Sequence, residues 1–122
     1  MVKQQMLLDS QRETLLNQGA ANLTCRMIDG NTKDYPPVVK LFNPCGAATW
    51  LISELDGDGD TAFGLCDLGF GTPELGYVSL EELASVELPF GLYIERDEHF
   101  TAKKTLGEYA AAARAAGRIE VC

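Results

Sequence analysis

The sequence of 122 residues has one histidine and one tryptophan, and its four cysteines show no CxxC spacing. A zinc site of the usual kind needs clustered cysteine and histidine ligands, so this pattern argues against one. Positive charge is also scarce, because 10 lysines and arginines face 18 aspartates and glutamates, giving a net charge of −8. Nucleic-acid affinity comes largely from lysine and arginine, so we expect a basic protein partner and no direct contact with nucleic acid.

Long hydrophobic runs are missing as well. No stretch approaches the length of a membrane span, and the apolar part of the N-terminus is too short for a signal peptide. We therefore expect a cytoplasmic protein with reduced cysteines, no cofactor and no membrane partner. Cys45 and Cys66 are expected in or near the core, with a disulfide between them as the alternative.

What the sequence does contain is a central stretch, Leu41 to Glu95, that holds the tryptophan and no lysine or arginine. Ten carboxylates fall within it: Glu54, Asp56, Asp58, Asp60, Asp67, Glu74, Glu81, Glu82, Glu87 and Glu95. Residues on one face of a strand are about 6.8 Å apart, and a DNA strand carries a charge every ~3.4 Å, so rows of carboxylates can imitate a phosphate track. An ordinary acidic, solubilising surface is the alternative.

Helix starts are marked by three capping boxes, in which a hydroxyl and a glutamate three residues later exchange hydrogen bonds with backbone amides. The pairs are Ser10 with Glu13, Ser79 with Glu82, and Thr105 with Glu108. They predict a first helix over residues 11–18 that stops at Gly19, and a second through about Val86. The third is expected over residues 106–116, ending at Gly117.

Strand-like runs fill most of the remaining sequence. They cover residues 38–42, 47–55, 61–68, 75–78 and 92–95. The glycine-rich turn Asp56–Asp60 predicts that the second and third runs form an antiparallel hairpin. Simple alternation places Trp50 and Ile52 on one face of the second strand and Leu51 and Leu55 on the other.

Together these elements predict an α+β fold. We expect a single domain over residues 1–122, with residues 1–8 as either a frayed start or a short extension of the first helix. Its sheet has three to five mainly antiparallel strands, and about three helices cover one face or lie at its ends.

The alternation of Asp56, Asp58 and Asp60 resembles the start of a calcium loop, in which carboxylates at the first, third and fifth positions point at one cation. That loop needs glycine at its sixth position and glutamate at its twelfth, where this chain has Thr61 and Asp67. A solvated hairpin turn is therefore the preferred interpretation, and no metal is expected.

Acid–base chemistry has few candidates, because His99 is the single histidine. Asp67 and Glu74 flank a glycine-rich loop and form a candidate carboxylate pair. The alternative is that Asp67 accepts backbone amides of this loop while Glu74 is solvated. A small hydrolase or ligand-binding enzyme would use these three residues with Arg96, and it requires all four in one pocket.

Several segments resemble a single family. They read VVKLFNPCGAATWLISELD, TAFGLCDLGFGTPELGYVSLEELASV and GLYIERDEHF, with a closing helix that ends AARAAGRI. On these segments the chain, from about Leu7 onward, resembles the family of domain of unknown function 2958, which consists of small bacterial proteins. The resemblance implies no catalytic residues. It implies an accessory role, because members are often encoded on plasmids and conjugative elements among genes that include antirestriction proteins.

The leading hypothesis is therefore a non-enzymatic anti-defence protein of a mobile genetic element, acting as an anti-CRISPR or antirestriction inhibitor. Its acidic surface would occupy the basic nucleic-acid-binding groove of a host defence protein. The predicted contacts are five carboxylates and one aromatic anchor: Asp56, Asp58, Asp60, Glu81, Glu82 and Phe70. Besides the enzyme, a structural or assembly protein is a further alternative, for which a large apolar surface patch would be the sign.

Overall fold

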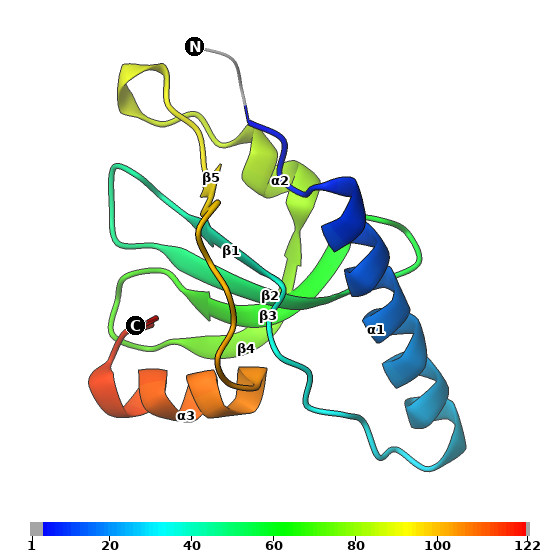
Figure 1. The fold of residues 1–122 in the computed structure, drawn as a ribbon. Coiled ribbons are helices and arrows are strands. Elements are labelled where there is room, and N and C mark those ends of the chain that lie inside the picture. The colour runs from blue at the N-terminus through cyan, green and yellow to red at the C-terminus, as the bar shows by residue number, and fades with distance from the viewer. Residues whose placement is uncertain (1–3, 122) are drawn as a thin grey trace.

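The structure, a computed structural model, describes residues 4–121. A five-stranded antiparallel sheet forms its centre, with helices against both faces (Figure 1). The elements are α1 (Asp9–Ile28), β1 (Val39–Phe42), β2 (Thr49–Leu55), β3 (Thr61–Asp67), β4 (Glu74–Ser79), α2 (Leu80–Ser85), the 3-10 turn η1 (Pro89–Gly91), β5 (Glu95–Arg96) and α3 (Leu106–Ala116). The predicted α+β fold is confirmed.

The strands lie in the order β4-β3-β2-β1-β5, so β4 and β5 form the two edges. The predicted hairpin of β2 and β3 is confirmed, with Thr49 opposite Asp67 and Leu55 opposite Ala62. The last strand is shorter than expected, because only Glu95 and Arg96 pair with β1.

A β-bulge interrupts β2, where its register against β3 shifts between Ile52 and Glu54. An extra residue reverses the side-chain alternation beyond it. Leu55 therefore packs in the same cluster as Trp50, and the prediction that it shares the face of Leu51 was wrong. The bulge also turns Glu54 onto the face of Leu51, where it lies near Phe63 and Leu106.

Two apolar clusters hold the sheet between its helices. The first lies on the side of α1 and α2 and contains Leu7, Leu15, Val39, Leu41, Trp50, Ile52, Leu55, Ala62, Leu80 and Ile94. The second lies under α3 and contains Leu51, Leu65, Leu106, Tyr109, Ala110 and Ala113. Because both faces are covered, β2 is buried along almost its whole length, as its apolar run predicted.

Helix α1 is longer than predicted. It begins after Leu8, whose amide donates to the Gln11 side chain at 2.9 Å, and not at a Ser10 cap. Gly19 lies inside the helix. A Cβ at this position would overlap the Leu55 carbonyl. The glycine therefore permits close packing of α1 on β2 and does not stop the helix.

The other two helices begin as predicted. The Ser79 hydroxyl accepts from the Glu82 amide at 3.2 Å, and the Thr105 hydroxyl accepts from the Glu108 amide at 3.2 Å. Helix α3 ends at Gly117, which adopts a left-handed φ of 77°.

The cysteines follow the prediction only in part. Cys66 is half-buried against the first cluster, and burial raises the pKa of its thiol. Cys45 is exposed, so its predicted place near the core was wrong. Both thiols are free, as is Cys25, which excludes the alternative disulfide. Among residues 4–121, no helix combines the length and the hydropathy needed to cross a membrane.

Candidate functional site

Three segments meet at one end of the β2–β3 hairpin: the hairpin turn, the start of α1 and the start of α2 (Figure 1). Arg12 of α1 donates to the Gly59 carbonyl of the turn at 2.9 Å. The Glu81 amide of α2 donates to the Asp60 carboxylate at 2.7 Å. These contacts bring together the predicted acidic residues Asp56, Asp58, Asp60, Glu81 and Glu82, which we call the acidic end.

Two of these carboxylates hold the local backbone. Asp58 accepts from the amides of Asp60 and Thr61 at 2.8 Å each, and from the Thr61 hydroxyl at 2.7 Å. The hydroxyl bond, followed by the two amide bonds, lowers the pKa of Asp58 below its usual value. Asp60 accepts from the Ser79 hydroxyl at 2.6 Å as well as from Glu81. Asp58 and Asp60 therefore shape the turn and fix α2 to it.

The other three carboxylates, Asp56, Glu81 and Glu82, are exposed. Within residues 4–121 their side chains make no hydrogen bond or ion pair, so they are free to meet a partner. The calcium interpretation finds no support in the described part of the chain, where no group of His, Cys, Asp or Glu residues is arranged to hold a metal ion.

Phe70 does not join the acidic end. It lies in the β3–β4 turn, and β3, with its seven residues, separates it from the acidic end by about 20 Å at about 3.3 Å per residue. Phe70 is 82% exposed and Phe90 is 94% exposed. We call the exposed residues Leu68, Phe70 and Phe90 the apolar end.

Contacts between turns keep the apolar end together. The β3–β4 turn approaches the β1–β2 turn, since a Cβ at Gly69 would lie 3.0 Å from the Cβ of Ala47. The Sγ of Cys45 lies 3.9 Å from the carbonyl of Pro89, next to Phe90. Both hairpin turns lie on the side of the sheet opposite the β2–β3 turn (Figure 1).

The four residues proposed for an enzyme lie at opposite edges of the sheet. Asp67 and Glu74 belong to β3 and β4, whereas Arg96 and His99 lie in and after β5. With about 4.8 Å between neighbouring strands, the two pairs are roughly 14–19 Å apart. The single pocket that the enzyme alternative requires is therefore not formed by these four residues.

Each of these residues is explained by its local contacts. Asp67, which is 3% exposed, accepts from the amides of Gly69 and Ile119 at 2.9 and 3.0 Å, so its predicted role in holding the loop is confirmed. Glu74 is exposed. The His99 amide donates to the Asp97 carboxylate at 2.8 Å, and the His99 side chain is exposed.

Arg96 holds the N-terminal segment against β5. Its guanidinium donates to the Gln5 carbonyl, and its amide donates to the Gln4 side chain at 2.6 Å. Leu7 is buried in the first cluster. The expected frayed start is thus wrong for residues 4–8, and residues 1–3 lie outside the described residues.

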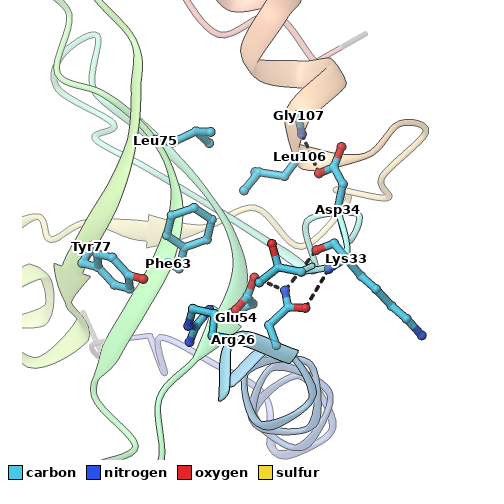
Figure 2. Close-up of a pocket in the computed structure, with 11 residues that line it drawn as sticks. Arg26, Lys33, Asp34, Glu54, Phe63, Leu75, Tyr77, Leu106 and Gly107 are labelled. Carbon is cyan, nitrogen blue, oxygen red and sulfur yellow. Dashed lines mark hydrogen bonds between the residues drawn. The ribbon is translucent and has the colours of Figure 1, made fainter. Parts of the chain in front are cut away.

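A pocket of about 300 Å³ opens on the face that Glu54 reaches through the bulge in β2 (Figure 2). Its lining comes from α1, the segment after α1, strands β2 to β4 and the start of α3: Asn22, Arg26, Thr32, Lys33, Asp34, Glu54, Phe63, Leu75, Tyr77, Leu106 and Gly107. Sequence reasoning missed this site. The available signal was Glu54 itself, a carboxylate inside an otherwise apolar central strand.

Glu54 is 8% exposed and lies at the floor of the pocket beside Arg26 (Figure 2). Its Oε2 accepts from Asn22 Nδ2 at 2.8 Å, and the Asn22 side chain also bonds both backbone groups of Lys33, at 2.8 and 3.0 Å. Burial raises the pKa of Glu54, while the Asn22 bond and the Arg26 charge oppose this. Its Oε1 makes no hydrogen bond to residues 4–121 and stays open to solvent.

The strands supply an apolar wall. The rings of Phe63 and Tyr77 lie 5.1 Å apart at 52°, and Leu75 continues this wall toward Leu106 of α3 (Figure 2). On the other side Asp34 accepts from the Gly107 amide at 2.9 Å and from the hydroxyl of the α3 cap residue at 2.6 Å. Asp34 is thus occupied by α3, which leaves Glu54 as the available carboxylate of the lining.

Comparison with known proteins gives a family match. The match covers residues 6–120, nearly the whole chain, and the family is described as a protein of unknown function, DUF2958. Neither the search of curated proteins nor the search of solved structures found a match. The segments that suggested the resemblance all fall within the matched range. The chain therefore belongs to the DUF2958 family.

Proposed function

We propose that this protein is a non-enzymatic anti-defence inhibitor whose acidic end binds a basic, nucleic-acid-binding protein of a host defence system. The observation that supports this most is the meeting of three separate segments at the acidic end. Asp56 comes from the hairpin turn, whereas Glu81 and Glu82 come from α2. Their side chains have no structural task, so their charge is available to a partner.

Charge of one sign at such a surface acts mainly on association. Carboxylates facing lysines and arginines speed the encounter of two proteins and fix their register, and the effect weakens as salt increases. The net charge of −8 works in the same direction over a longer range. The mobile-element setting implied by the family resemblance gives such an inhibitor a task, because incoming plasmids meet host nucleases.

The first test is a plasmid-transfer assay in bacterial hosts that carry a restriction or a CRISPR system. Cells expressing the protein should accept a targeted plasmid more often than cells with an empty vector. A non-targeted plasmid should enter both equally. Unchanged transfer across all these systems would contradict the anti-defence role.

The second test concerns the surface. The triple variant Asp56→Lys, Glu81→Lys, Glu82→Lys should lose protection and slow association with the inhibited nuclease by about tenfold or more at low salt. Its matched control reverses three exposed carboxylates outside the acidic end: Glu74→Lys, Glu87→Lys, Glu120→Lys. Both variants change the net charge equally. Equal losses in the two would reject the acidic end as the contact surface.

The apolar end favours a second candidate, a structural or assembly role. Phe90 adopts a left-handed φ of 63°, which is unusual for a bulky residue, and presents its ring to solvent. Such rings serve as anchors in interfaces. If assembly is the main role, the double variant Phe70→Ser, Phe90→Ser should abolish self-association or partner capture while the acidic-end triple leaves both unchanged.

A further inference from the structure

The pocket around Glu54 is independent of both ends of the molecule, and the proposed function does not use it. Glu54 is more than nine-tenths buried and lines the pocket, and within residues 4–121 only its Oε2 is hydrogen-bonded, to Asn22. The second oxygen of this carboxylate is therefore an acceptor that a ligand in the pocket can use in place of water. We propose that this pocket binds a nucleobase, as the free base or a nucleoside.

The polar floor of the pocket fits the edge of a base. Glu54 supplies an acceptor, and the Arg26 guanidinium beside it supplies donors (Figure 2). The two charges attract each other without forming an ion pair within 4.0 Å, and the Arg26 side chain makes no hydrogen bond or ion pair within residues 4–121. A base edge carries N–H donors next to carbonyl or ring-nitrogen acceptors, so one base can bridge both side chains. Guanine presents both kinds of group at once.

The wall of the pocket fits the face of a base. Phe63 and Tyr77 present rings from neighbouring strands, and Tyr77 is 59% exposed. Bases stack on aromatic side chains in single-strand and RNA recognition, and the stacking tolerates different bases because every base has a π face. Leu75 and Leu106 extend the apolar surface from these rings toward α3 (Figure 2).

The charge of the lining favours a neutral ligand. At the floor the charges of Glu54 and Arg26 oppose each other, and Asp34 is engaged by α3, while the whole chain carries −8. A nucleotide with its phosphates would meet this net repulsion, whereas a base or nucleoside would not. An aromatic amino acid is the main competing ligand, since its ammonium and carboxylate would also meet Glu54 and Arg26.

The site is also built to keep its shape. The bulge in β2 turns Glu54 into the pocket, and Asn22 clamps both the carboxylate and the backbone of Lys33. The Gln18 side chain donates to the Ser53 carbonyl at 2.6 Å, which satisfies the bulged backbone. Pre-organised groups bind with a smaller loss of conformational entropy.

Calorimetric titration of the full chain with guanosine, cytidine, adenosine, uridine and phenylalanine tests the proposal. We expect saturable binding of at least one nucleoside, with guanosine strongest, and no binding of phenylalanine. Backbone NMR shifts should change around residues 22–34, 54, 63, 75–77 and 106–107. No saturable signal with any nucleoside up to about 1 mM, or binding of phenylalanine alone, would overturn the proposal.

Variants then locate the site. Glu54→Gln and Tyr77→Ala should each weaken nucleoside binding about tenfold, because one removes a charged acceptor and the other a stacking surface. Glu74→Gln and Phe70→Ala, which change an exposed carboxylate and an exposed ring elsewhere, should bind as the unaltered chain does. Fluorescence of the buried Trp50, on the other face of the sheet, reports whether each variant is folded. Undiminished binding by folded Tyr77→Ala and Glu54→Gln would place any nucleoside elsewhere and reject this pocket.

Discussion

The acidic end and the apolar end of the sheet are each stabilised by an aspartate that accepts backbone amides, but one presents charged and the other apolar side chains. At the acidic end Asp60 accepts from the amide of Glu81, and at the apolar end Asp67 accepts from the amides of Gly69 and Ile119. In both places an aspartate fixes a turn to a neighbouring segment. The two ends differ in what is left over, which is free carboxylates at one and exposed phenylalanines at the other.

The comparison separates structural charge from available charge. Asp58 and Asp67 are both acidic, but each already accepts hydrogen bonds from two backbone amides and holds the local backbone. Asp56 lies two residues from Asp58, but its side chain accepts no hydrogen bond within residues 4–121. The surface available to a partner is therefore smaller than the number of carboxylates indicates, because some of them hold the backbone of this protein.

Breaking the apolar end at its aspartate should have the largest effect. Asp67→Ala removes a buried acceptor and leaves the amides of Gly69 and Ile119 without a partner, so we expect a loss of about 3 kcal/mol in the free energy of unfolding. Urea unfolding followed by Trp50 fluorescence measures it. Asp67→Asn, which keeps one acceptor, should lose about half as much. A loss below about 1 kcal/mol for the alanine variant would show that the turn does not depend on this carboxylate.

The equivalent change at the acidic end should cost less. Asp60 is only half-buried, so Asp60→Ala should lower the free energy of unfolding by about 1.5 kcal/mol as the Ser79 and Glu81 bonds are lost. Hydrogen exchange at the Glu81 amide should accelerate as α2 loosens. Asp56→Ala, the matched control, should leave stability within about 0.5 kcal/mol. Equal losses in both variants would remove the distinction between structural and available carboxylates.

Local signals predicted much of this fold. The caps at Ser79 and Thr105 and the stop at Gly117 depend on neighbouring backbone alone, and all three are where the sequence placed them. The β2–β3 hairpin likewise follows from its glycine-rich turn. By contrast, Gly19 looks like a helix stop in sequence, and only its contact with Leu55 reveals why glycine is required inside α1.

The candidate sites were harder to predict because they depend on long-range geometry. The sequence did not show whether the five predicted acidic contacts share one face; the structure brings the hairpin turn and α2 together, whereas Phe70 lies beyond the far end of β3. The place of Glu54 in a pocket was not predicted, because period-two alternation does not include a bulge. The bulge determines which face of the sheet the carboxylate reaches. Asn22, its partner, lies 32 residues away in the chain.

The smallest expected effect is that of pH on stability, which acts differently through two carboxyl groups. Asp58 and Glu54 belong to one hairpin, but their pKa values are shifted in opposite directions. The pKa of Asp58 lies below its usual 3.8, so its stabilising effect is complete above that pH and is lost as the pH falls through the folded-state pKa. The pKa of Glu54 lies above its usual 4.5, so the folded protein binds this proton more tightly, and stability declines as the pH rises from 4.5 through the folded-state pKa.

Carboxyl-carbon NMR titration of both side chains measures these two directions, and urea unfolding across the same pH range measures their effect on stability. Glu54→Gln should remove the decline above pH 4.5 and leave the acid-side loss intact. Thr61→Val, which deletes the hydroxyl donor to Asp58, should instead bring the pKa of Asp58 closer to its usual value and reduce the acid-side loss. If Glu54 titrated below 4.5, its burial would be offset by the Arg26 charge, and the carboxylate at the floor of the pocket would already be paired rather than open to a ligand.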